Sequence, residues 1–282
     1  QTTGAALSGS ITDKVQGRIA VNQTTSDGYT NNTFLNRDDT GRIDETILRG
    51  KFAAQVNDDT DVGLTYLYAD IDNGYDAFSL DNTRETLSDE PGKDAQQTLA
   101  TALNINSQLN DAVIMQTELT RSRSDVEYSY DEDWSFVGIE PALEYSTFDQ
   151  YLRDYERDSV DLRLLSGSDG RIFGNSTDWV AGIYAMQRNE DLTRNYSGST
   201  SAFSSELQSS SVAGYGELTI NINETLRLIY GLRVENWINQ YSDSADIVGE
   251  TDETLFGSKS TLEALLSYDH LAYVSLARGY KA

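Results

Sequence analysis

The chain has 282 residues, no cysteine, two prolines and a formal net charge of -25. Disulfides and thiolate metal sites are therefore excluded, and no nucleic-acid partner is expected, because affinity for nucleic acid comes chiefly from Lys and Arg contacts to phosphates. No stretch approaches the roughly 18 apolar residues that a membrane helix needs, which excludes a helical membrane protein.

Apolar residues recur at every second position in many separate segments, and this period predicts β-strands. The alternation is clear in "KVQGRIAVN", "LRGKFAAQV", "DVGLTYLYAD" and "LRLIYGLRVE". In the last segment Leu228 and Val234 fall on one face, whereas Arg227 and Arg233 fall on the other. About twelve strands are predicted, near residues 4–11, 14–24, 42–56, 61–70, 96–106, 111–122, 156–166, 178–189, 207–222, 225–237, 258–268 and 271–281.

The links between these strands alternate between short and long from end to end. Short links are predicted at "TD" near residue 12 and at 57–60, 107–110, 223–224 and 269–270, with a moderately short one at 167–177. Long, polar loops are predicted at 26–41, 71–95, 123–155, 190–206 and 238–257. An up-and-down meander of this kind places all short turns on one rim and all long loops on the other, as in outer-membrane barrels.

The two faces of the predicted strands suit two different surroundings. Several strands reach about 9–11 residues, the length that crosses a bilayer at a tilt. Arg49, Lys51, Arg227 and Arg233 lie on the less apolar face and are expected to face a wet lumen. Aromatic residues near strand ends are typical of a membrane-interface girdle; they are Tyr66, Tyr68, Trp179, Tyr184, Tyr230, Trp237, Tyr268, Tyr273 and Tyr280.

These patterns predict an all-β fold, an antiparallel up-and-down transmembrane β-barrel with short periplasmic turns and long extracellular loops. A soluble β-meander or sandwich is the alternative from the pattern alone, because alternating strands can also cover a protein core. The strand lengths and the charged residues on the second face favour the membrane barrel.

Three stretches resemble the barrel of TonB-dependent outer-membrane receptors of the siderophore type. One is "YERDSVDLRLLSGSDGRIFGNSTDWVAGIYAMQRNED", in which Asp161, Arg163, Trp179, Gly182 and Tyr184 stand at the family's positions. The second, "VAGYGELTININETLRLIYGLRVE", is similar to the hairpin that follows. The third, "YVSLARGYKA", is similar to a later strand of that barrel. With the acidic "YSYDEDW" at 128–134, the resemblance spans most of the chain.

The resemblance implies that residues 1–282 are a central part of a barrel domain. Family members have 22 strands around a plugged lumen, so about twelve strands imply that the plug domain and the C-terminal strands are absent here. The expected partners are the TonB complex, through the plug, and outer-membrane lipid and lipopolysaccharide. The alternative is a complete small porin or adhesin barrel, and a soluble carbohydrate-binding β protein is a third hypothesis.

The function that the resemblance implies is TonB-energised uptake of a scarce, bulky nutrient across a bacterial outer membrane, with a ferric siderophore as the expected ligand. No enzyme activity, resident cofactor or metal site is expected. The single histidine, His270, falls in a predicted two-residue turn and is not expected to act as a ligand or base.

The predicted loop at 123–155 carries the candidate ligand-capture residues. Aromatic side chains interleaved with charge suit the binding of a bulky complex, because they offer an apolar body with a polar tip; these candidates are Tyr128, Tyr130, Trp134, Tyr151 and Arg153. Packing of the same residues against neighbouring loops is the alternative. Acidic loops would repel an anionic ferric complex unless arginines such as Arg123 and Arg153 offset them locally, so the identity of the ligand is open. "DIDNGYD" at 70–76 only loosely resembles a calcium loop, and calcium is not expected there.

Overall fold

The computed structural model describes residues 1–141 and 145–281, and all regular structure in them is β. Twelve long strands make up the fold, and two further strands of two residues each lie in long loops. The strands are β1 (Thr2–Thr12), β2 (Val15–Ser26), β3 (Asn31–Asn32), β4 (Ile43–Asn57), β5 (Thr60–Tyr75), β6 (Glu85–Thr86), β7 (Gly92–Asn110), β8 (Val113–Asp131), β9 (Phe148–Ser166), β10 (Thr177–Tyr196), β11 (Phe203–Asn221), β12 (Leu226–Asp243), β13 (Val248–Ser267) and β14 (His270–Arg278).

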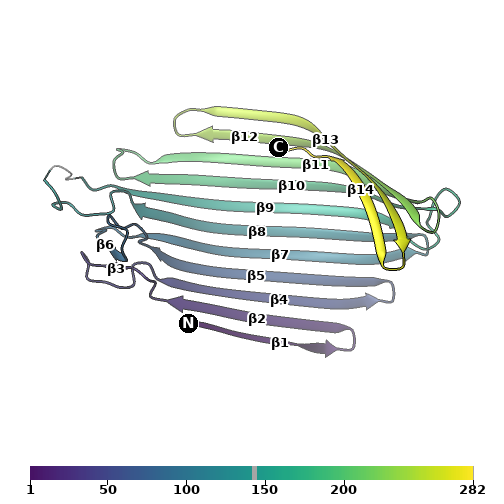
Figure 1. Cartoon of the computed structure of the whole chain (residues 1–282), viewed down its shortest axis with the longest axis horizontal. Coiled ribbons are helices and arrows are strands. Elements are labelled where there is room, and N and C mark those ends of the chain that lie inside the picture. Colours follow the sequence, from purple (N-terminus) through teal and green to yellow (C-terminus); the bar gives the residue numbers. More distant parts are fainter. Residues whose placement is uncertain (142–144, 282) are drawn as a thin grey trace.

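The twelve long strands form one antiparallel sheet in which each strand pairs with the next long strand along the chain. Figure 1 shows this meander as a single curled layer, with β13 and β14 turning away from the plane of the other strands. β1 and β14 are its edges, so the sheet is open over the described residues. β3 and β6 pair in parallel and join the β2–β4 loop to the β5–β7 loop. The described part of the chain contains no helix that could span a membrane.

The predicted fold class and the number of long strands are confirmed. The predicted strands end too early on the side of the long loops. The loop predicted at 123–155 is only 132–147, since β8 continues to Asp131 and β9 begins at Phe148, and residues 142–144 of it lie outside the described structure. The loops predicted at 190–206 and 238–257 are likewise shortened, to 197–202 and 244–247.

One face of the sheet is apolar along the part of its strands nearer the short turns, and is called the apolar face below. Its side chains stay exposed, with Ile183 at 62% and Val212 at 64%, because no second layer covers them. Among the described residues Met186 and Ala213 are the only buried apolar side chains. A cross-strand row on this face runs through Phe52, Leu64, Leu103, Leu119, Val160, Ala185 and Val212.

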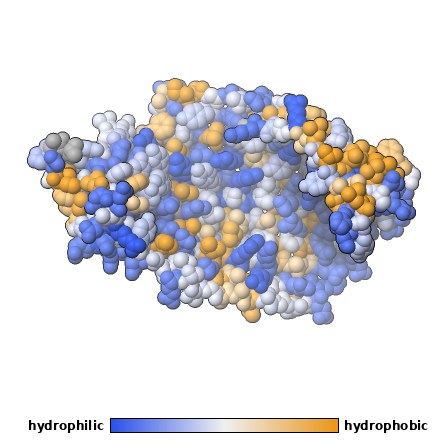
Figure 2. Space-filling model, in the orientation of Figure 1, coloured by the Kyte–Doolittle hydropathy of each residue, from blue (hydrophilic) through white to orange (hydrophobic). Residues whose placement is uncertain are grey.

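The opposite face, called the polar face, carries most of the charged and tyrosine side chains of the strands. Figure 2 shows the hollowed side of the curled sheet, where hydrophilic residues predominate, while apolar side chains gather over the ends of β13 and β14. The predicted girdle is partly wrong. Tyr66 and Trp179 share the apolar face. Tyr184 and Trp237 lie on the polar face, where Tyr184 accepts a hydrogen bond from Arg157.

The strands are longer than a bilayer requires. Four of them, β7, β8, β9 and β11, have 19 residues, which corresponds to roughly 60 Å at about 3.3 Å per residue. A tilted span across the hydrocarbon core needs only about 9–11 residues. The apolar row described above lies nearer the short turns, so the extra length extends toward the long loops. The contacts of these loops therefore lie away from the apolar row.

Candidate functional site

The cross-strand registers place the predicted site residues on two regions of the polar face. Tyr128, Tyr130, Tyr151 and Arg153 lie near the long loops but in strands β8 and β9, so their assignment to a loop is wrong. Trp134 alone of that group lies in a loop. Arg49, Lys51, Arg227 and Arg233 share the same face lower down, on β4 and β12.

A buried carboxylate, Asp149, organises the upper region. Asp149 lies at the start of β9 and is fully buried. Arg194 of β10 donates two hydrogen bonds to its carboxylate, from Nε to Oδ1 at 2.9 Å and from a terminal nitrogen to Oδ2 at 2.7 Å. The hydroxyls of Tyr151 and Tyr130 donate to Oδ2 at 3.0 Å and 3.4 Å. A planar, bidentate pair of this kind fixes the orientation of the arginine as well as its charge.

The ionisation of these groups follows from the same contacts. Burial would raise the pKa of Asp149, but the hydrogen bonds from Arg194 and Tyr151 outweigh it, so its pKa lies below the ordinary value. Burial raises the pKa of Tyr128, and its contact with Tyr75 adds to the shift. The upper region is therefore a set of neutral phenols around an ionised carboxylate and its arginine.

Aromatic rings and guanidinium groups line this region together. The ring of Tyr128 meets Tyr75 edge-on at 5.1 Å and lies 6.4 Å from Tyr151. The guanidinium groups of Arg153 and Arg194 lie 5.1 Å and 5.3 Å from the centre of the Tyr151 ring. Two guanidinium groups thus lie within cation–π distance of the same tyrosine ring.

The long loops above the region are held to one another by aromatic stacking. Phe34 of the β2–β4 loop stacks on Phe136 of the β8–β9 loop at 4.3 Å. Phe78 of the β5–β7 loop stacks on Trp134 at 4.6 Å. The fully buried Asn32 donates to the Asp76 carboxylate at 2.9 Å and to the Ser88 carbonyl at 2.8 Å. Three loops that are far apart in sequence therefore form one packed unit.

A second polar cluster lies on the wall below. The Tyr215 hydroxyl donates to Asp161 Oδ1 at 2.6 Å, two strands away. Arg233 Nε donates to Glu235 at 3.0 Å and to the Tyr280 hydroxyl at 2.9 Å, and Tyr280 in turn donates to Glu235. The Arg233 guanidinium also lies 5.8 Å from the centre of the Tyr215 ring, so the motif residues of "YGE", "LRVE" and "GYK" meet in one cluster that runs from β9 to the segment after β14.

The other predicted lumen residues have fewer partners. Arg227 pairs with Glu263 near the short turns. Arg49 and Lys51 take part in no ion pair within the described structure, and they lie on β4, far along the sheet from β12. Arg123 pairs with Glu156 at 3.1 Å but lies on the side of the sheet that carries the apolar face, away from Arg153.

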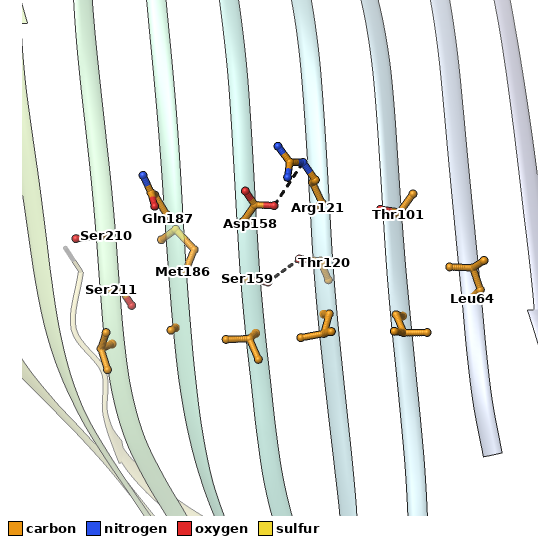
Figure 3. Close-up of a pocket in the computed structure, with 15 residues that line it drawn as sticks. Leu64, Thr101, Thr120, Arg121, Asp158, Ser159, Met186, Gln187, Ser210 and Ser211 are labelled. Atoms are coloured by element: carbon orange, nitrogen blue, oxygen red, sulfur yellow. Dashed lines mark hydrogen bonds and ion pairs between the residues drawn. The ribbon is translucent and has the colours of Figure 1, made fainter. Parts of the chain in front are cut away.

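The apolar face carries a shallow groove of about 570 Å³ at the upper border of its apolar row. Figure 3 shows this groove, in which Leu64 lies in the apolar row and Thr101, Arg121, Asp158 and Gln187 lie in the row above. Arg121 and Asp158 are paired at 3.7 Å. The face therefore changes from apolar to charged within two residues along β8 and β9, a change that is typical of a membrane interface.

Sequence reasoning missed Asp149, Arg194 and Tyr196. Their signal is present as period-two alternation, with Asp149, Tyr151 and Arg153 in one strand and Arg194 and Tyr196 in the next. The alternation was not recognised because both faces are polar at this height. Arg194 also lies 5.3 Å from the Tyr196 ring.

The segment at 70–76 does not gather its acidic residues. Asp72 accepts from Arg42 at 2.5 Å, and Asp76 accepts from Asn32 and from Thr86, the latter at 2.7 Å. Over the described residues the one group of three close carboxylates is a different one, Asp89, Asp131 and Asp133.

No protein-family model matches the sequence, and no curated protein sequence matches it. Solved structures do match. The ferric yersiniabactin uptake receptor FyuA from Yersinia pestis has a TM-score of 0.78 and 17% identity over 97% of this chain and 44% of its own. The ferric citrate transporter FecA has a TM-score of 0.77 and 10% identity over 97% and 40%. The siderophore receptor PiuA from Acinetobacter baumannii has a TM-score of 0.75 and 13% identity over 98% and 47%.

The chain therefore has the fold of a sector of the β-barrel wall found in these receptors and transporters, and the predicted resemblance is confirmed at the level of the fold. The chain spans 44%, 40% and 47% of the length of the three structures.

Proposed function

We propose that this chain is part of the barrel of a bacterial outer-membrane receptor for TonB-energised uptake of a bulky iron complex, with a ferric siderophore as the ligand class. The shared fold supports the assignment to a receptor barrel. The proposed ligand class rests on the cluster around Asp149 near the long loops. On this proposal residues 1–282 belong to a single barrel domain, and a plug inside the barrel is the contact with the TonB complex.

The chemistry of the upper region suits an anionic, partly aromatic complex. Tyr128 and Tyr151 offer ring faces, and Arg153 and Arg194 supply positive charge beside them. Arg194 is paired with Asp149 at 2.7 Å and Arg153 with Glu190 at 4.0 Å. Their guanidinium groups would offer an anionic ligand charged donors in a chain that has 46 acidic and 21 basic residues. Trp134, stacked on Phe78, would form the boundary of this binding region on the side of the long loops.

On this proposal the two faces of the sheet contact different surroundings. The apolar face would contact outer-membrane lipid, and its charged upper border would meet the lipopolysaccharide headgroups. The polar face, with Arg49, Lys51, Arg227 and Arg233, would line the lumen beside the plug. This arrangement leaves the exposed apolar row in the one solvent that stabilises it.

Two other hypotheses fit less well. A soluble carbohydrate-binding protein would expose a broad apolar row to water, with Ile183 and Val212 more than half exposed. A complete small porin or adhesin would be expected to pair its first and last strands, whereas β1 and β14 are edges within the described part.

The test is iron-limited growth of a bacterial host that lacks its own siderophore receptors and expresses the native protein containing this chain. Ferric catecholate, hydroxamate, phenolate and citrate complexes are supplied separately. We expect growth on at least one complex, and no growth when the host also lacks TonB. Growth that does not need TonB would contradict energised uptake and favour a porin.

The site itself is tested by direct binding in detergent, using quenching of intrinsic fluorescence by each ferric complex. Arg153→Gln should weaken binding by roughly 10- to 100-fold, since one lost charge-assisted contact is worth about 1.5–3 kcal/mol. Arg227→Gln, on the same face but near the short turns, is the matched control. Equal affinity in both variants would place the ligand elsewhere.

A further inference from the structure

Three carboxylates gather between two of the long loops, where β8 ends. One oxygen from each of Asp89, Asp131 and Asp133 lies within 4.8 Å of the other two. Asp89 belongs to the β5–β7 loop, whereas Asp131 ends β8 and Asp133 follows it in the β8–β9 loop. Within the described ranges none of the three takes part in an ion pair. The cluster therefore concentrates negative charge with no basic side chain against it.

Several oxygens in this cluster are buried and have no hydrogen-bond partner in the described structure. Asp131 is 6% exposed; its Oδ1 accepts from the backbone N–H groups of Asp133 at 3.1 Å and Trp134 at 3.2 Å, but its Oδ2 has no partner. Asp89 Oδ1 and the hydroxyl of Ser88, the residue before Asp89 and only 2% exposed, also have none in the described structure. One such atom costs about 1–3 kcal/mol, so a group of them in one place indicates a shared ligand.

The loop backbone holds these oxygens in position. Asp133 Oδ1 accepts from the Ser135 N–H at 3.0 Å and Oδ2 from the Thr147 N–H at 3.2 Å, while the buried Thr147 hydroxyl has no partner of its own in the described residues. The Asp89 N–H donates to the Ser135 carbonyl at 3.1 Å. The backbone of the two loops thus holds the three carboxylates close together.

We propose that Ser88, Asp89, Asp131 and Asp133 form a calcium-binding site that ties the β5–β7 loop to the β8–β9 loop. The donors are all oxygens, which hard divalent cations prefer. Oxygens that all lie within 4.8 Å of one another can share one ion, and an irregular set of loop carboxylates suits Ca²⁺, which accepts flexible geometry, better than Mg²⁺, which requires near-ideal octahedral geometry. Water and the Thr147 hydroxyl would complete the coordination.

The site lies beside Trp134, whose backbone N–H donates to Asp131 and whose ring stacks on Phe78. Bound calcium would therefore fix the loop pair that covers the Tyr128 region. Calcium binding stands independently of the proposed transport function, because it is measured on the protein alone, without an iron complex or TonB.

The experiment uses terbium, a luminescent stand-in for calcium, and the native protein containing this chain, purified in detergent and freed of metal with EDTA. Excitation of indole should give saturable terbium emission through Trp134. Calcium should displace the terbium with a Kd on the order of 10⁻⁴–10⁻³ M, the range of extracellular calcium modules. Magnesium at the same concentration should not. Absence of saturable emission, or equal displacement by magnesium, would overturn the assignment.

The variants separate the site from other carboxylates. Asp131→Asn and Asp89→Asn should each weaken calcium binding, followed by calorimetry, by at least the roughly 10–100-fold that loss of an outer-shell partner costs. Trp134→Phe should abolish the emission but keep calcium binding. Asp246→Asn, in the β12–β13 loop, is the matched control and should change neither. Unaltered calcium affinity in Asp89→Asn, which is half-buried in a loop and should not prevent folding, would refute the site.

Discussion

The Tyr215 hydroxyl of β11 reaches over Gly182 of β10 to donate a 2.6 Å hydrogen bond to Asp161 of β9. A Cβ at position 182 would lie 2.4 Å from the Tyr215 ring, so only glycine leaves room for this ring. The bond thus links two strands that are not neighbours in the sheet. Gly182 is the middle residue of this contact, which explains the glycine in "WVAGIY".

Gly182→Ala should displace the Tyr215 ring and break its bond to Asp161. We expect a loss of about 1–3 kcal/mol in the free energy of unfolding, the usual cost of overpacking a filled site. Urea unfolding in lipid vesicles measures it. Gly214→Ala is the control, because no atom lies within 4 Å of a Cβ there; it should be neutral or stabilise by about 0.4–1 kcal/mol. Equal losses in both would mean that the ring contact is not the cause.

Asp149→Asn should loosen the upper ends of β9 and β10, because Arg194 loses its bidentate partner. Arg194 keeps a 39% exposed side chain and remains solvated, so the expected cost is modest, about 1–3 kcal/mol. Hydrogen exchange of residues 148–155 and 190–196 measures the effect. Faster exchange confined to these segments supports the assignment, and unchanged exchange contradicts it.

Acid should have the same effect on the unaltered protein. Folding lowers the pKa of Asp149, so its ion pair contributes stability above the ordinary carboxyl pKa of about 3.9, and this contribution is lost as the pH falls through the lower folded-state value. Protection of 148–155 should therefore persist to pH values below about 3.9 and then decline. In Asp149→Asn this acid-dependent decline should be absent.

Ile183→Lys should destabilise the protein far more than Gln187→Lys, although both residues lie on the same face of β10. Ile183 lies in the apolar part of this face, where a lysine facing lipid costs about 2–4 kcal/mol. Gln187 lies at the charged border of the face, where a lysine costs about 0–1 kcal/mol. Unfolding in vesicles of defined lipid gives both values. Two small and equal costs would favour a soluble protein over a membrane barrel.

Phe78→Ala should release the β5–β7 loop from Trp134. The stacked pair is worth about 0.5–1.5 kcal/mol beyond its buried area, so local opening should be roughly two- to tenfold more frequent. Cleavage by a protease within 76–91 and 132–147 reports that opening. Phe173→Ala, on the opposite rim and 74% exposed, is the control; cleavage raised equally in both variants would speak against loop-to-loop stacking.

The prediction from sequence was accurate where the two faces of a strand meet different solvents. In β4, Lys51 and Phe52 alternate between a polar and an apolar side, and the period of two predicted this strand correctly. Toward the long loops both faces are polar, the contrast disappears, and the same reasoning treated Tyr128 and Tyr151 as loop residues. Backbone pairing, which a hydrophobicity pattern does not register, extends those strands.

The sequence by itself determined the all-β meander, the alternation of short turns with long loops, and the polar and apolar sides of each strand, because these depend on neighbours in the chain. Only the tertiary structure decided which side chains meet. Asp149 and Arg194 are 45 residues apart and Tyr215 and Asp161 are 54 apart, so their contacts depend on strand register. The Asp89 and Asp131 carboxylates are likewise brought together by packing between two loops, which no local pattern specifies.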